Sequence, residues 1–204
     1  MKAPSCGHLS GLSAAEIEQC FADTFARRYR VKLQGGASEP EYRPSTNGYH
    51  HLIYRENFPA SALHEVAHWC IAGETRRKQV DFGYKYLPPP RSTRETLAFR
   101  DFERRPQALE SVFAAAARVR FVVSADDLDL SPDAYQDFCV EVARSVPDTV
   151  AWIQSSSDRR AYDFLGALLA CRHINSIAHE SDAVSHWLAT LSINPFPQSS
   201  AGRG

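Results

Sequence analysis

The chain has 204 residues, of which 44% are hydrophobic and 23% are charged. This composition is typical of a soluble globular protein and excludes a disordered, collagenous or repeat protein. Lysine and arginine number 23 against 24 aspartates and glutamates, giving a net charge of -1. We therefore expect no binding to bulk nucleic acid or to an anionic membrane surface.

The cysteines and the N-terminal sequence indicate a cytoplasmic protein. The five cysteines are scattered and form no Cys-x-x-Cys pair: Cys6, Cys20, Cys70, Cys139 and Cys171. We expect them to be reduced thiols. The first residues lack the apolar core of a signal peptide, and no window approaches the roughly 20 apolar residues of a membrane span.

The two ends of the chain differ in composition from the rest. Residues 1–13 are mostly small and polar, and residues 195–204 contain little that a core would bury. We expect both to be disordered tails. Residues 14–194 then form a single catalytic domain.

The N-terminal part of this domain predicts a helix followed by a small sheet. Apolar residues at three-and-four spacing predict a helix capped by Ser13, with Glu16 completing a capping box, as far as Tyr29. Residues 31–33 and 51–54 are short and rich in β-branched or aromatic side chains. They predict two strands on either side of a polar loop.

A second helix is predicted over residues 60–72. Pro59 suits its first turn and Gly73 its end, and its apolar residues indicate burial. Residues 82–87 predict a further strand, ended by the prolines of 88–90. Helical patterns follow over 94–102, 106–117, 131–145, 149–154 and 162–191. The predicted class is therefore α+β, a mostly helical single domain with a small β-sheet.

The strongest chemical signal is the sequence His64-Glu65-Val66-Ala67-His68. On a helix, residues four apart stand one turn above each other, so both imidazoles can bind one metal ion. Polar side chains on a buried helix need partners, which a metal supplies. The sequence predicts a buried metal-binding helix. The alternative is a pair of core histidines bonded to backbone or carboxylate groups.

A third ligand is expected from the acidic residues that follow, either Glu103 or Glu110. Pro106 has no N–H and suits the first turn of a helix, which would put Glu103 at the start of that helix. Glu110 borders the apolar stripe of the same helix. We therefore predict Glu103 as the ligand and Glu110 as a solvent-facing acid.

Several longer motifs resemble one known family. These are the stretch from Ala60 to Gly73, Arg76-Arg77, Val80-Asp81-Phe82-Gly83-Tyr84-x-Tyr86, Glu103-x-x-Pro106-Gln107-Ala108-Leu109, Cys20-Phe21-Ala22-Asp23-x-Phe25 and Glu39-Pro40-x-Tyr42. Together they resemble the bacterial elongation factor P hydroxylases over about residues 15 to 125. The resemblance implies a metal-dependent monooxygenase that hydroxylates the lysylated lysine of elongation factor P. This modification helps ribosomes through proline runs.

The resemblance also implies iron, as Fe2+, held by His64, His68 and Glu103, with dioxygen as co-substrate. The order of these ligands is that of zinc peptidases, so zinc and a zinc-dependent peptidase of the His-Glu-x-x-His type stay open. A metal-stabilised protein that only binds a translation component is a third alternative. No pattern indicates a 2-oxoglutarate site, and the co-substrate that supplies electrons is left open.

Neighbouring residues are candidates for roles in catalysis or substrate binding. Glu65 would be the water-activating base of a peptidase or a proton-handling group of a hydroxylase. Asp81 would orient a metal-bound histidine or cap a turn. Tyr84 and Tyr86 lie two apart on a predicted strand and would either line a pocket for an aliphatic lysyl chain or be ordinary core or surface aromatics, which we favour.

Overall fold

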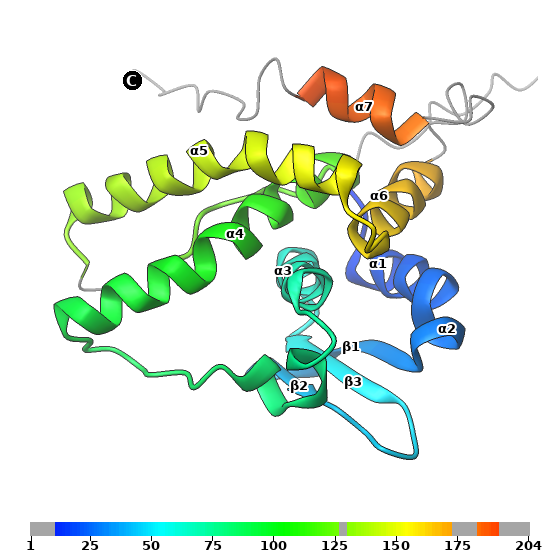
Figure 1. Ribbon diagram of the computed structural model, residues 1–204, viewed down its shortest axis with the longest axis horizontal. Helices are drawn as coiled ribbons and strands as arrows, with labels where there is room; N and C mark the ends of the chain where they lie inside the picture. The colour runs from blue at the N-terminus through cyan, green and yellow to red at the C-terminus, as the bar shows by residue number, and fades with distance from the viewer. Residues whose placement is uncertain (1–10, 127–129, 173–182, 192–204) are drawn as a thin grey trace, which may run out of the picture.

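The structure is a computed structural model that describes residues 11–126, 130–172 and 183–191. Its first helical stretch, blue in Figure 1, is continuous through α1 (Ala14–Phe21), a π-helical segment (Ala22–Ala26) and α2 (Arg27–Tyr29). The Ser13 hydroxyl accepts from the backbone N–H of Glu16, whose carboxylate accepts from the backbone N–H of Ser13. The predicted capped helix is confirmed.

The predicted N-terminal tail, residues 1–13, includes a residue that is part of the fold. Leu12 is buried, and its backbone N–H donates to the carbonyl of Ala117 at 2.9 Å. The chain is therefore packed against the fold before α1 begins. Leu9 and Leu12, among small and polar residues, are too few to form a periodic pattern, which is why the sequence did not reveal this contact. Residues 1–10 and 195–204 lie outside the described residues.

A three-stranded sheet follows, in the order β1-β3-β2. β1 (Val31–Ala37) is parallel to β3 (His50–Arg55), and β2 (Glu41–Arg43) is antiparallel to β3. The predicted strands lie within β1 and β3 and are confirmed. β2 was not predicted because so short a strand shows no alternation that distinguishes it from a loop.

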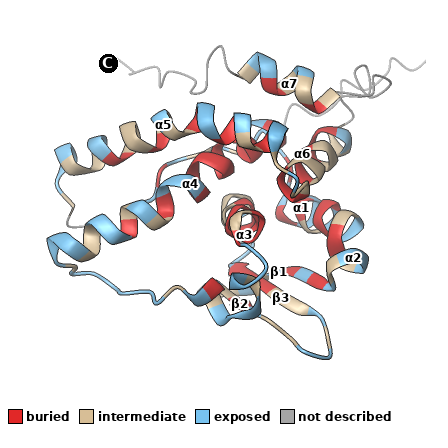
Figure 2. Cartoon of the chain, viewed as in Figure 1, coloured by how far each residue is buried: buried red, intermediate tan, exposed pale blue. Residues whose placement is uncertain are grey.

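α3 (Pro59–Ile71) lies at the centre of the fold and is seen nearly end-on in Figure 1. It packs against β3 and α4 (Thr93–Ala117), and also against α1 and α6 (Arg160–Cys171). Figure 2 shows how much of it is buried. The buried apolar residues of α3 are Ala62, Leu63, Val66, Ala67, Trp69 and Cys70. The predicted buried helix is confirmed.

The strand predicted over residues 82–87 is absent. In its place the chain forms a short 3-10 segment (Val80–Gly83), in which Asp81 and Phe82 have φ of 46° and 56°. The turn brings the Asp81 carboxylate to the backbone N–H of Tyr42 in β2, which donates to it at 2.8 Å. A side chain thus satisfies one backbone donor of β2, and residues 82–87 add no strand to the sheet.

α4 is one helix, whereas the sequence predicted two, over 94–102 and 106–117. Pro106 lies inside it and not in a first turn, so the expected start of a helix next to Glu103 is wrong. Proline removes the backbone hydrogen bond to the carbonyl of Phe102. Because Pro106 is itself buried, packing offsets this loss, and Glu103 and Glu110 lie on one continuous helix.

α5 (Pro132–Ser155) and α6 pack against the two central helices, and α7 (Ala183–Leu191) packs against α6. α5 packs along α4 and runs through Pro147, where the sequence predicted a break between 145 and 149. α6 begins two residues before the predicted stretch 162–191, and α7 falls within it. Residues 173–182 of that stretch lie outside the described residues.

Two further expectations concern the whole chain. No helix in the described ranges is long and apolar enough to cross a membrane. The four cysteines in these ranges, Cys20, Cys70, Cys139 and Cys171, are free thiols as predicted, and Cys6 lies outside the described residues.

Arg160 connects α6 to the C-terminal end of α3. It is 1% exposed, and its guanidinium lies 4.6 Å from the ring centre of Trp69. It donates to the carbonyl of Trp69 and, at 2.8 Å, to that of Ala72, and it pairs with Asp158 at 2.6 Å. These contacts satisfy backbone carbonyls that the end of a helix leaves without partners.

We predict that Arg160→Met destabilises the protein by about 3 kcal/mol, because it removes the donor to the buried carbonyl of Trp69, one of the two donors to the carbonyl of Ala72, and the cation that pairs with Asp158. Urea unfolding measures this change. The control is Arg159→Met, which alters a less buried arginine stacked on Tyr162. Equal effects of the two substitutions would contradict a bridging role for Arg160.

Candidate metal centre

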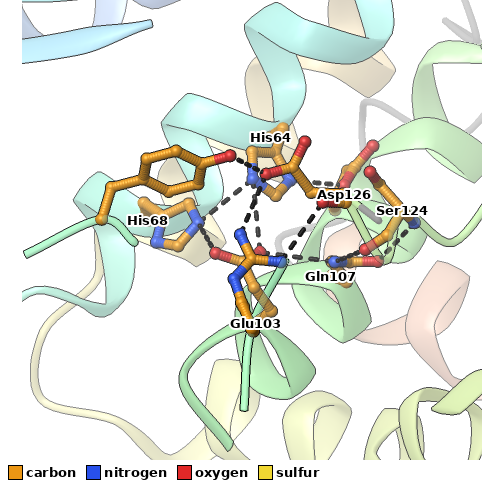
Figure 3. Close-up of polar contacts among 9 residues, drawn as sticks. His64, His68, Glu103, Gln107, Ser124 and Asp126 are labelled. Carbon is orange, nitrogen blue, oxygen red and sulfur yellow. Dashed lines mark hydrogen bonds and ion pairs between the residues drawn. The ribbon is translucent and has the colours of Figure 1, made fainter. Parts of the chain in front are cut away.

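α3 presents two imidazoles toward α4 (Figure 3). His64 and His68 are one helical turn apart, and their Nε2 atoms lie 3.1 Å from each other. Apart from Glu65, the other buried residues of α3 are apolar. The two imidazoles therefore form a polar face of α3 that is directed at α4.

Glu103 of α4 completes a triangle with the two imidazoles. Its Oε2 lies 3.4 Å from Nε2 of His64, and its Oε1 lies 3.2 Å from Nε2 of His68. A metal with bonds of about 2.1 Å holds neighbouring ligand atoms about 3.0 Å apart at a right angle and about 3.4 Å apart at the tetrahedral angle. The spacing of the three side chains fits a single ion, and the three form a metal-capable group among the described residues.

Glu110 is buried, so the expectation of a solvent-facing acid is wrong. Its Oε2 lies 2.8 Å from Nδ1 of His64. Because α4 does not break at Pro106, Glu110 follows Glu103 by two turns on the same face. A carboxylate on Nδ1 fixes the imidazole orientation and leaves Nε2 free to bind a metal.

The charges of this cluster depend on one another. Burial works against the charged form of His64, but the hydrogen bond to Glu110 and the charge of Glu103 raise its pKa to about 10. Burial also opposes ionisation of Glu103, whereas His68 lowers the pKa of that carboxyl to about 2. The carboxylates thus favour a positive charge between them, which a divalent cation supplies in place of the proton.

His68 is held by aromatic rings. The ring of Phe102 stacks on its imidazole at 5.2 Å between centres, and Phe82 lies on a parallel plane at 6.4 Å. Tyr84 continues this stack, with its ring 3.8 Å from that of Phe102. A pocket of about 180 Å³ borders the same part of the site and is lined by His68, Ile71, Ala72, Arg76, Phe82, Asp101, Phe102, Arg105 and Pro106.

The other predicted catalytic residues lie in different surroundings. Glu65 is buried, which raises the pKa of its carboxyl, and it accepts no hydrogen bond from a described residue. Asp81 binds the backbone of Tyr42. This contact with β2 belongs to neither predicted role, the orientation of a histidine or the capping of a turn. Burial raises the pKa of the Tyr84 phenol, and the negative charge of the nearby Glu103 carboxylate raises it further.

Sequence reasoning missed two groups near the metal ligands. Gln107 donates to Glu103 and bonds twice to the backbone of Ser124. Arg91, whose side chain is 2% exposed, pairs with Asp126, which also accepts from the Tyr86 hydroxyl. The spacing of Glu103 and Gln107, four apart on a helix, is the one sequence signal for these contacts.

Comparison with known proteins gives two similarities. A family model described as Elongation factor P hydroxylase matches residues 20–182. The chain is also 37% identical over 157 residues to a protein of Haemophilus influenzae named Elongation factor P lysine hydroxylase. That alignment covers 76% of this chain and 86% of the relative. The residues that the family model matches include His64, His68 and Glu103.

We predict that Glu103→Gln costs several kcal/mol of affinity for Fe2+ or Zn2+, since it removes an ionised ligand. Glu110→Gln should weaken binding about tenfold, because His64 loses the carboxylate that orients it. Metal titration of the apo-protein measures both. Glu74→Gln, a change at an exposed acid paired with Lys78, serves as the control and should leave affinity unchanged. A larger loss at Glu110 than at Glu103 would move the carboxylate ligand to Glu110.

Proposed function

The chain belongs to the elongation factor P hydroxylase family, and we propose that it hydroxylates a lysine of elongation factor P at a metal held by His64, His68 and Glu103. The observation that carries this proposal is the close approach of the two imidazoles and the Glu103 carboxylate. The two Nε2 atoms lie 3.1 Å apart, and each lies 3.2 or 3.4 Å from one of the two carboxylate oxygens. Elongation factor P acts in translation, which takes place in the cytoplasm, so the proposed enzyme is cytoplasmic.

The metal of this proposal is iron, as Fe2+, and the enzyme is a monooxygenase. Two imidazoles and one carboxylate on one face leave coordination positions open, as in non-haem iron oxygenases. Iron bound there supplies the activation of dioxygen that insertion of oxygen into a C–H bond requires. Zinc binds the same donors but has no redox chemistry, so membership of a hydroxylase family supports iron. Neither similarity supports the zinc peptidase alternative.

The residues around the ligands have distinct tasks in this proposal. Glu110 keeps Nε2 of His64 directed at the centre by holding Nδ1. Phe102 and Phe82 fix the plane of His68. Glu65 handles a proton, because burial raises its pKa and favours the protonated acid.

The substrate side chain is expected to approach beside His64, which is 24% exposed where His68 and Glu103 are each 9% exposed. Tyr84 would line this approach, since its phenol is near Glu103 and its ring face is held by Phe102. An aliphatic lysyl chain packs well on aromatic surfaces. The lysylated lysine implied by the family resemblance is long enough to benefit from such contact.

We predict that the Fe2+-loaded protein, with dioxygen and a reductant, adds one oxygen atom to the lysylated lysine of elongation factor P. Mass spectrometry of the modified peptide detects the product. His64→Ala should abolish it while leaving the circular dichroism spectrum unchanged, because the domain has a large core that does not depend on the metal.

Glu65→Gln separates the hydroxylase from the peptidase. A hydroxylase should keep its metal and about a tenth or more of its activity, because the change affects a neighbour of the ligands and not a ligand. A peptidase should lose its general base and fall by orders of magnitude. Cleavage of elongation factor P that disappears in Glu65→Gln would contradict the proposed function.

A further inference from the structure

Gln107 has a buried amide with partners on two different segments. It is 1% exposed. Its Nε2 lies 3.3 Å from Oε2 of Glu103 and donates to the carbonyl of Ser124 at 2.7 Å. Its Oε1 accepts from the backbone N–H of Ser124 at 3.0 Å. Figure 3 draws these contacts between Glu103 and Ser124.

The partners determine which way the amide faces. If the amide of Gln107 were reversed, its oxygen would face a carboxylate and a carbonyl, and its nitrogen would face an N–H. Every contact would then be repulsive. Position 107 therefore needs a side chain that is as long as glutamine and carries both a donor and an acceptor at its end. A glutamate or an apolar side chain at 107 cannot reproduce the three contacts.

Ser124 belongs to a segment that is fixed at several points. The neighbouring Val123 is buried, and its carbonyl accepts from the Tyr135 hydroxyl at 2.9 Å. Two residues beyond Ser124, Asp126 pairs with Arg91 and accepts from Tyr86. Gln107 therefore joins Glu103 to the segment 119–126, which in turn contacts the segment 84–91.

We propose that Gln107 is a positioning residue, which fixes the carboxylate of Glu103 and couples it to the segment 119–126. This inference rests on the proposed function, because it gives Glu103 the role of a metal ligand. A carboxylate that accepts an N–H from the side keeps one orientation and so meets the metal with less loss of entropy. The position of the segment 119–126 thereby influences the geometry of the metal site.

The test uses Gln107→Met, which keeps the length of the side chain and removes all three contacts. Gln107→Asn is a second variant, which keeps the amide but is too short to reach both partners. Ser111→Ala is the control, because Ser111 is also buried on α4 but bonds only to the carbonyl of Ala108 within the helix. Binding of Co2+ to each full-length apo-protein is followed by its visible absorption, together with thermal unfolding.

We expect Co2+ to bind about tenfold more weakly to Gln107→Met and Gln107→Asn, with an altered visible spectrum, while Ser111→Ala keeps the wild-type affinity and spectrum. Unchanged affinity and spectrum in both Gln107 variants, with or without a lower melting temperature, would overturn the positioning role. Failure of the wild-type protein itself to bind Co2+ would overturn the proposed metal site, and the inference with it.

Discussion

The contact between the histidine face of α3 and the acidic face of α4 is the interaction on which the site depends. Two imidazoles and two carboxylates, largely withdrawn from water, meet within 2.8 to 3.4 Å of one another. Buried charges of this kind are costly unless each has a partner. The two helices can therefore pack closely here only if the His–Glu contacts, or a metal among them, balance the charge.

The rest of the fold keeps these two helices in place. The sheet and α1 cover the apolar faces of α3, and α5 packs along α4. Arg160 binds the carbonyls at the end of α3 and so holds the C-terminal end of this helix in place. The site is thus built on packed helices, and such elements hold a small set of side chains in the geometry of metal ligands.

The sequence was informative where a pattern repeats over several turns or recurs as a motif. The capped first helix, the buried helix carrying His64 and His68, and the two longer strands all have such patterns. The motifs were also sufficient to indicate the family. The choice of Glu103 relied partly on the motif and partly on a helix start at Pro106 that the structure does not have.

The errors share a physical cause, namely that tertiary packing outweighs local preference. Pro106 and Pro147 are accepted inside long helices because neighbouring helices hold those helices together. The segment after α3 turns at Asp81 to satisfy the backbone of β2, although its composition favours a strand. The burial of Glu110 could not be predicted, because its partner, His64, lies 46 residues away in the sequence and no local pattern indicates such a contact.

The most direct test is a crystal structure of the protein grown with Fe2+ in the absence of air, with an anomalous difference map at the iron absorption edge. We expect one strong peak within bonding distance of Nε2 of His64, Nε2 of His68 and the carboxylate of Glu103, with Glu110 still on Nδ1 of His64. A peak bound by other residues, or none at these three side chains, would contradict the account.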